Sequence, residues 1–394
     1  MRRAIVSLNV GSSSIKFGIF AIEAQGLRRR AHGKIESIGI EPHLYVIGGD
    51  GERLIDRTWP GEDGLDHEAL LRELIDYASD NLTDVQVVAI GHRVTHGGSQ
   101  FRHPRLVDDA VLHALDDLVR LAPLHQPHNL AGIRMLRALR PALPQVACFD
   151  TEFHVWRPDV AKRYAVPDTW RKKGVASYGF HGLSYEHVAA TLALSEPHLS
   201  HGRVLAAHLG NGASLCAMID GRSIDTTMGF SPLDGLVMGT RCGSLDPAVV
   251  IHMIQAEGLT ASEVEASLYR KSGLLGVSGV SSDMRVLQAS EDPRAAEAIE
   301  LFVWRIVREI GGLVAVMGGL DALIFTGGIG ENDAAVRNDV CERLKWLGVS
   351  LDPGANGRGA RSINATDSTV AVRIIATDEE RMIARHCQRL LSLN

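Results

Sequence analysis

Hydrophobic and polar residues follow two different periods along this chain, and the two kinds of segment alternate. Leu71, Leu74, Ile75 and Ala78 recur at helical spacing, and a continuous apolar run over 85–90 then predicts a buried strand. Similar signals predict further helices from residue 108, from residue 129, over 292–317 and after residue 380, and further strands over 146–149, 321–326 and 370–376. This alternation of helices and strands is typical of an α/β protein.

Two turns rich in glycine and serine each follow an apolar strand. The first lies in NVGSSSIKF (9–17), and the second lies in HLGNGAS (208–214). In both, the apolar pattern resumes after the turn as apolar/polar alternation, which predicts a β-hairpin. Glycine and serine let backbone amides approach an anion, so a repeated turn predicts two lobes that face one polyphosphate. Each turn alone also fits an ordinary hairpin, and the register between the two copies is uncertain by one residue.

A third glycine-rich turn, over 327–332, follows the strand predicted at 321–326. The chain contains no GxxxxGK[ST] sequence, which excludes a P-loop protein. Gly210-Asn211-Gly212 and Gly328-Ile329-Gly330 contain GxG, but neither has the third glycine of a dinucleotide-binding fingerprint. Three glycine turns after strands still favour nucleotide binding, with two turns for phosphates and one for the nucleoside.

The length of the chain, 394 residues, predicts two domains rather than one core. We place them at 1–150 and 151–380, and we expect the last segment, 381–394, to pack back on the first domain. The formal net charge of −6 argues against a nucleic-acid partner. Polar residues at the ends of parallel strands lie where open α/β sheets bind ligands, which favours Arg93 and Asp150 as functional residues.

The cysteines and the apolar runs bear on the compartment of the protein. The 5 cysteines include no CxxC pair, which indicates neither a zinc site nor a disulfide framework and fits a reducing cytoplasm. The apolar stretch after Met1 is interrupted by Ser7 and Asn9, too early for a signal peptide. No apolar run is long enough to span a membrane. We therefore expect a soluble cytoplasmic protein without a membrane partner.

A series of motifs between residues 5 and 384 resembles the acetokinase family. In order, they are NVGSSSIKF (9–17), GHRVTHGG (91–98), LAPLH (121–125), FDTEFH (149–154), YGFHG (178–182), HLGNGAS (208–214), DTTMGFSPLDGLVMGTR (225–241), SGVSSDMR (278–285), FTGGIGEN (325–332) and TDEE (377–380). The resemblance implies the actin-like ATPase (ribonuclease H-like) fold, with two duplicated lobes and a nucleotide cleft between them. It also implies reversible transfer of the γ-phosphoryl group of ATP to acetate or another short carboxylate, which gives an acyl phosphate and ADP.

This reaction makes its own physical demands on the site. A carboxylate substrate is already ionised at neutral pH, so its attack needs no strong general base. The site must instead bring two anions together and stabilise the charge on the transferred group. The resemblance gives Arg93 to the substrate carboxylate and Arg241 and His181 to the transition state. It gives Asp150 a proton-transfer role, although placing the metal is an alternative for that carboxylate.

The resemblance also implies the remaining binding residues. A pocket for the acyl group is expected from Thr95, Leu124, Phe180 and Pro232. Mg²⁺, with Mn²⁺ as a possible substitute, is expected at Asn9 and Glu379. The nucleotide is expected at Ser12, Ser14, Lys16, His208, Leu209, Gly210, Asn211, Gly212, Asp283, Met284, Arg285, Gly328, Ile329, Gly330, Glu331 and Asn332. A homodimer is also implied, with the second domain as its interface.

The sequence departs from the usual family pattern in three places. Thr95 stands where valine is usual, Leu183-Ser184-Tyr185 stands where Thr-Ser-His is common, and the residues after Arg241 also differ. A hydroxyl in the acyl pocket changes which acid fits, because one methylene is worth only about 1–3 kcal/mol of discrimination. A propionate or butyrate kinase therefore remains an alternative. An ATP-dependent switch protein without catalytic activity is the alternative from another class.

Overall fold

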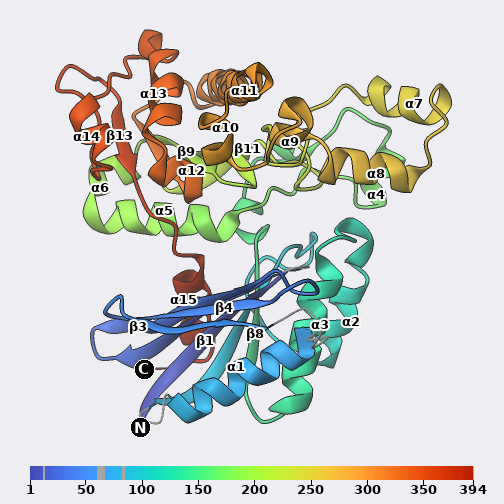
Figure 1. Cartoon of the computed structure of the whole chain (residues 1–394), viewed down its shortest axis with the longest axis vertical. Helices are drawn as coiled ribbons and strands as arrows, with labels where there is room; N and C mark the ends of the chain where they lie inside the picture. Colours follow the sequence, from blue (N-terminus) through green and yellow to red (C-terminus); the bar gives the residue numbers. More distant parts are fainter. Residues whose placement is uncertain (12–13, 60–66, 82–84, 394) are drawn as a thin grey trace. The chain divides into compact units, whose positions relative to one another are not determined.

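The computed structural model describes residues 1–11, 14–59, 67–81 and 85–393 (Figure 1). The chain divides into two compact units, each with its own sheet. Unit 1 comprises Met1–Glu152 and Asp378–Asn394, and unit 2 comprises Phe153–Thr377. The two sheets with their helices confirm the predicted α/β class. Within the described residues, no helix combines the length and the apolar character that a bilayer span requires.

Unit 1 holds the first strands and the last helix of the chain. Its strands are β1 (Arg2–Val10), β2 (Ile15–Glu23), β3 (Gly26–Glu36), β4 (His43–Gly48), β5 (Arg53–Thr58), β6 (Val85–Val94), β7 (Arg105–Leu106) and β8 (Gln145–Phe149). Its α-helices are α1 (His67–Asn81), α2 (Asp109–Asp116), α3 (Gln126–Leu139) and α15 (Glu379–Leu390).

Unit 2 holds the middle of the chain. Its strands are β9 (Arg203–Leu209), β10 (Ala213–Ile219), β11 (Arg222–Thr226), β12 (Ala322–Thr326) and β13 (Ala371–Ile374). Its α-helices are α4 (Asp168–Lys172), α5 (Gly182–Ser195), α6 (Pro197–Ser200), α7 (Pro247–Gln255), α8 (Ala261–Arg270), α9 (Gly273–Ser278), α10 (Met284–Gln288), α11 (Pro293–Met317), α12 (Gly327–Asn332), α13 (Ala334–Glu342) and α14 (Pro353–Gly357).

The two sheets repeat one topology. The order β3–β2–β1–β6–β8 in unit 1 matches the order β11–β10–β9–β12–β13 in unit 2. In each sheet, the first three strands of this order pair with one another in antiparallel fashion. The last two strands run parallel to the third, which is the central strand. This match confirms the predicted duplicated fold of the actin-like ATPase type.

The strand pairing around the two hairpin turns explains how the two sequence copies align. Val10 pairs with Ile15 around the turn at 11–14. Leu209 pairs with Ala213 around the turn at 210–212. The first turn is thus one residue longer, and this explains why the two sequence copies align with an uncertainty of one residue.

Local signals place several helix starts correctly. The side chain of Asp108 caps α2 by accepting from Val111 N, and Asp292 caps α11 with Pro293 in the first turn. Helix α3 begins earlier than the expected residue 129, at Gln126, because Pro127 fits its first turn.

The sheet of unit 1 has two different faces. Leu8 and Phe17 lie on the face that packs against α1 and α3 (Figure 1). The opposite face carries Gly91, where an added Cβ would lie 2.3 Å from Ile383 Cγ2 of helix α15. Helix α15 therefore lies directly on β6, and only glycine permits this close approach. Because side chains alternate along strands, the residues next to Leu8 and Phe17 face α15.

The sheet of unit 2 is also covered by helices on both faces. Leu205 and Leu215 share a core with Phe302 of α11, whereas Ala206 and Cys216 share another core with residues of α5. The alternation of side chains continues to the ends of β9 and β10. It places the last polar residues of these strands on the α5 side of the sheet.

Candidate active site

A polar cluster lies at the ends of three neighbouring parallel strands in unit 1. Asn9, Arg93 and Asp150 belong to or directly follow β1, β6 and β8. Arg93 Nε donates to Asp150 Oδ1 at 2.9 Å, and Arg93 Nη2 donates to the other carboxylate oxygen. Arg93 Nη1 also donates to Asn9 Oδ1 at 3.3 Å. The structure thus brings together these three residues, which the sequence places far apart.

Burial and charge are unevenly divided in this cluster. The Asp150 side chain is 1% exposed, whereas that of Arg93 is 21% exposed. Burial, with a smaller contribution from Glu379, raises the pKa of Asp150 to about 6 against the lowering effect of Arg93. Burial lowers the pKa of Arg93, but Asp150 and Glu379 outweigh this effect, so the guanidinium stays charged. Asp150 orients a partly exposed cation that can receive a second anion.

Further predicted residues surround this cluster on the α15 face. Lys16 is exposed on β2 and pairs with Asn9 across the hairpin. The backbone oxygen of Ser14 accepts a hydrogen bond from Gly11 N at 2.8 Å. Ser12 lies outside the described residues. Glu379 begins α15, after the capping residue Asp378. These positions place one lysine and one glutamate on the face that carries Arg93.

The oxygen atoms of this cluster fit a weakly chelated Mg²⁺. Asn9 offers an amide oxygen, and Glu379 offers a carboxylate. No group of three or more His, Cys, Asp or Glu side chains suited to a metal occurs among the described residues. Mg²⁺ keeps several waters and commonly takes substrate phosphates as ligands, so a small set of protein oxygens suits it.

The four residues expected at the acyl group belong to both units. The Thr95 hydroxyl and backbone amide both donate to Asn129 Oδ1 at 3.0 Å. Leu124 is half-buried in the turn before α3. Phe180 and Pro232 are buried in unit 2. The extra hydroxyl of Thr95 is therefore bonded within unit 1, and the pocket itself stays a prediction.

In unit 2, two histidines stack at the ends of α5 and β9. The rings of His181 and His208 have their centroids 4.3 Å apart and lie 25° from parallel. His181 Nδ1 lies 2.8 Å from Ser214 Oγ, and His208 Nδ1 lies 2.8 Å from Ser184 Oγ. His181 has a φ of 57°, in the left-handed region that non-glycine residues rarely adopt. Such strain is common at functional sites, where the surroundings hold the residue in place.

Arg241 and His181 meet at the glycine turn between β9 and β10. A Cβ added to Gly212 would lie 3.3 Å from His181 Nε2 and 3.8 Å from Arg241 Nη1. Arg241 Nη1 donates to the backbone oxygen of Pro232 at 3.0 Å, which orients the guanidinium. The structure thus gathers a cation, an imidazole and a glycine backbone within unit 2.

A cavity of about 610 Å³ lies beside this turn, within the size range of small-molecule sites. Its lining joins the three predicted nucleotide segments, and it comprises Gly210, Asn211, Ser282, Asp283, Met284, Arg285, Gln288, Gly328, Ile329, Asn332, Asp333 and Ala334. Ser282 lies in the SGVSSDMR motif but is not among the predicted nucleotide residues, and Gln288, Asp333 and Ala334 lie outside the motifs. His208, Leu209, Gly212, Gly330 and Glu331 do not line the cavity.

Glu331 has internal partners instead. One of its carboxylate oxygens accepts from Gly327 N at 2.8 Å and from Thr377 N at 2.9 Å. This carboxylate ties the β12–α12 turn to the segment that leaves unit 2. Its expected contact with the nucleotide stays a prediction, and the described contacts give it a structural role.

Gly239→Ala tests the nucleotide cavity. A Cβ at this position would lie 2.0 Å from Asn211 Oδ1, so the Asn211 side chain must leave its place in the cavity lining. We expect the KM for ATP to rise about tenfold, the cost of about one hydrogen bond. Gly357→Ala is the matched control, because a Cβ there meets no atom within 4 Å. Equal ATP affinity in the two variants would contradict the assignment of this cavity.

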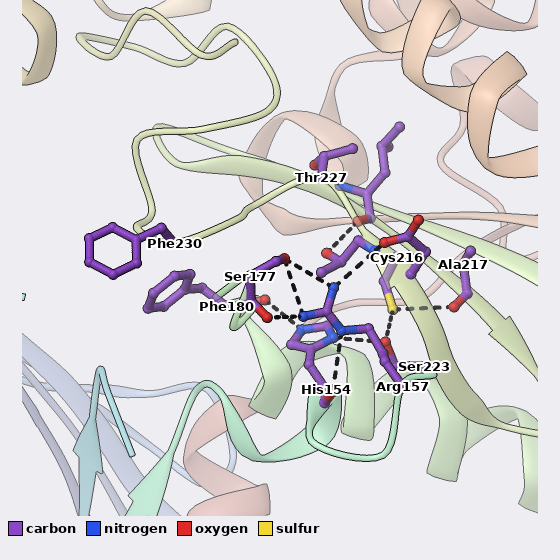
Figure 2. A network of polar contacts seen from close by, with 12 residues as sticks. His154, Arg157, Ser177, Phe180, Cys216, Ala217, Ser223, Thr227 and Phe230 are labelled. Carbon is purple, nitrogen blue, oxygen red and sulfur yellow. Dashed lines mark hydrogen bonds and ion pairs between the residues drawn. The ribbon is translucent and has the colours of Figure 1, made fainter. Parts of the chain in front are cut away.

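A buried polar network fastens the segment before His181 (Figure 2). His154 Nδ1 lies 2.8 Å from Ser223 Oγ, and its Nε2 donates to the backbone oxygen of Phe180 at 2.9 Å. Arg157 is 2% exposed and donates to the Ser177 backbone oxygen at 2.7 Å. The network thus holds Phe180, the immediate neighbour of His181, against β11.

His154 predicts a measurable pH dependence of stability. Burial, with a smaller contribution from the charge of Arg157, lowers its pKa to about 3. In the unfolded chain it takes up a proton near pH 6.5, so its stabilising contribution is complete above that pH and is lost as the pH falls towards 3. When the pH is lowered from 7 to 5, we expect the free energy of unfolding of the wild type to fall by about 2 kcal/mol more than that of His154→Gln. Denaturant titrations at both pH values measure this difference, and equal losses would contradict it.

Comparison with known proteins agrees with these features. The chain matches the acetokinase family over residues 4–385. It is 50% identical to the acetate kinase of Rhodopseudomonas palustris over 395 residues, which cover 99% of both chains. Its structure resembles a propionate kinase of Francisella tularensis, with a TM-score of 0.90 and 36% identity over 98% of both chains. The acetate kinase of Porphyromonas gingivalis has a TM-score of 0.86 and 35% identity, over 99% of this chain and 100% of that one. This chain belongs to the acetokinase family.

Proposed function

We propose that this protein is an acetate kinase, which transfers the γ-phosphoryl group of ATP reversibly to acetate and forms acetyl phosphate and ADP. One observation carries the proposal within this family. Arg93, held by Asp150, forms one cationic site, and Arg241 with His181 forms another beside the glycine turn of unit 2. Relatives that are named acetate kinases share about half of its residues.

The residues of unit 1 bind the acid. Acetate is ionised at neutral pH, so the Arg93 guanidinium binds it by charge and by forked hydrogen bonds. The bonds from Arg93 to Asp150 and Asn9 fix the plane of the guanidinium before the acid arrives. Asp150 therefore acts here by orienting Arg93, and no proton has to leave the nucleophile.

The residues of unit 2 bind the nucleotide and stabilise the transferred group. The cavity lined by Asn211, Asp283 and Gly328 holds the nucleotide. The turn at Gly212 leaves backbone exposed to the phosphates, and Arg241 and His181 lie beside it. During in-line transfer these side chains stabilise the negative charge on the equatorial oxygens of the phosphoryl group.

Asn9 and Glu379 would hold Mg²⁺, directly or through water. The ion supplies charge neutralisation at the β- and γ-phosphates when it is bound. Mn²⁺ accepts the same oxygen donors and is the expected substitute. We also propose that the protein acts in the cytoplasm as a homodimer, which the family resemblance implies.

A propionate kinase is the second candidate function. The structural similarity to a propionate kinase and the Thr95 substitution favour it. Purified protein with Mg²⁺ and ATP is given acetate, propionate or butyrate in turn, and the acyl phosphate is trapped with hydroxylamine. The highest kcat/KM for acetate supports an acetate kinase, and a preference for a longer acid replaces it with the second candidate. ATP hydrolysis without any acyl phosphate favours an ATP-dependent switch protein.

A further inference from the structure

Two buried hydroxyl groups lie in series behind the His181 ring. Ser214 Oγ is 2.8 Å from His181 Nδ1, and Tyr185 Oη is 2.5 Å from Ser214 Oγ. Ser214 and Tyr185 are both 0% exposed. Water therefore does not reach either hydroxyl, and their protons must be shared among protein groups.

The surroundings of Tyr185 decide the direction of these hydrogen bonds. Burial raises the pKa of Tyr185 well above its usual value. The phenol therefore keeps its proton, and this buried proton needs an acceptor, which Ser214 Oγ provides at 2.5 Å. Ser214 Oγ then donates its own hydroxyl proton to His181 Nδ1. The reverse direction would leave the buried phenolic proton without an acceptor among its partners in the described chain.

The other ring nitrogen of His181 lies on the side of the candidate site. His181 Nε2 would be 3.3 Å from a Cβ at Gly212, and Arg241 Nη1 would be 3.8 Å from the same point. A neutral imidazole carries one proton, and a hydrogen bond accepted at Nδ1 places that proton on Nε2. Two imidazolium ions stacked as closely as His181 and His208 would repel each other, and the nearby Arg241 disfavours a further charge.

We propose that Tyr185 and Ser214 are positioning residues that hold neutral His181 as its Nε2–H tautomer, so that the ring donates a hydrogen bond to the transferred phosphoryl group. This role rests on the proposed kinase function, since it assigns a phosphoryl oxygen as the acceptor. We call the series Tyr185–Ser214–His181 the relay. It gives a role to Tyr185, one of the residues at which the sequence departs from the usual family pattern.

The experiment combines nitrogen NMR of the histidine-labelled, ligand-free protein with steady-state kinetics. The variants are Tyr185→Phe, Ser214→Ala and the double variant, and a His181→Gln variant assigns the His181 signals. Tyr185→Phe keeps the ring that packs edge-on against His154, at a centroid distance of 5.7 Å. Tyr45→Phe is the control, because it removes a phenolic hydroxyl from β4 of unit 1.

We expect the wild-type His181 signals to show the Nε2–H tautomer and those of Tyr185→Phe to shift towards Nδ1–H. Each single variant should lower kcat about tenfold or more with little change in KM, as loss of an orienting partner does. The double variant should be no slower than Ser214→Ala, because the phenol acts only through the serine. Tyr45→Phe should match the wild type in both readouts.

Three results would overturn the relay: an Nδ1–H tautomer in the wild type, a wild-type kcat in Tyr185→Phe, or effects that multiply in the double variant. Failure of the proposed function has a separate signature. The wild type would then form no acyl phosphate, while the NMR spectra would still report the tautomer.

Discussion

Arg93→Lys is expected to lower kcat/KM for acetate by about a hundredfold or more. The planar guanidinium of arginine can donate to Asp150 from two of its nitrogens and still offer N–H groups to the acid. Lysine keeps the positive charge but has only one nitrogen, so it cannot do both. The loss should therefore come from geometry, and the KM for ATP should change little. Steady-state kinetics with acetate as the varied substrate measures the effect.

Arg134→Lys is the matched control for this substitution. Arg134 also forms an ion pair with an aspartate of unit 1, Asp116, but its side chain is 48% exposed on the surface. We expect this variant to retain wild-type kinetics, because exposed ion pairs contribute little. If Arg93→Lys were as active as Arg134→Lys, Arg93 would not be the carboxylate-binding residue.

Arg241→Ala is expected to lower kcat by about a hundredfold to a thousandfold, the usual cost of removing one donor from a preorganised anion site. Its guanidinium lies beside Gly212 and His181, whereas the nucleotide cavity is lined by other residues. ATP binding, measured by calorimetry, should therefore survive in the variant. This combination of retained binding and lost turnover identifies a residue that acts in the transition state.

Arg270→Ala is the control for Arg241→Ala, since Arg270 is exposed at the end of α8 in the same unit. We expect it to leave both kcat and ATP binding unchanged. A variant of Arg241 that lost ATP binding and kept its kcat at saturating ATP would show that Arg241 is only a nucleotide-binding residue.

Features set by local chemistry could be predicted from the sequence. The hairpin turns follow from short runs of glycine and serine, and the starts of α2 and α11 follow from the capping residues Asp108 and Asp292. The pairing of Arg93 with Asp150 follows almost as directly, because both residues end parallel strands and such ends meet at one edge of a sheet.

Features set by contacts between distant segments could not be predicted in this way. Glu331 lies in a glycine motif that resembles a nucleotide site, yet its carboxylate accepts from the backbone of Thr377. Ser214 and Tyr185 become partners of His181 only because β10 packs against α5. Ser214 ends the HLGNGAS motif and Tyr185 follows the YGFHG motif closely, but neither motif indicates this role, since serine and tyrosine are common in buried cores and turns.

The most direct test of the central claim follows the oxygen atoms of the acid. The protein is incubated with Mg²⁺, ATP and acetate labelled with heavy oxygen in its carboxylate, and the products are examined by phosphorus NMR. Direct attack by the carboxylate predicts acetyl phosphate in which labelled oxygen bridges carbon and phosphorus, with one ADP formed for each acyl phosphate. Formation of ADP and unlabelled inorganic phosphate without acetyl phosphate would contradict the account, because ATP would then be hydrolysed by water rather than used to phosphorylate the acid.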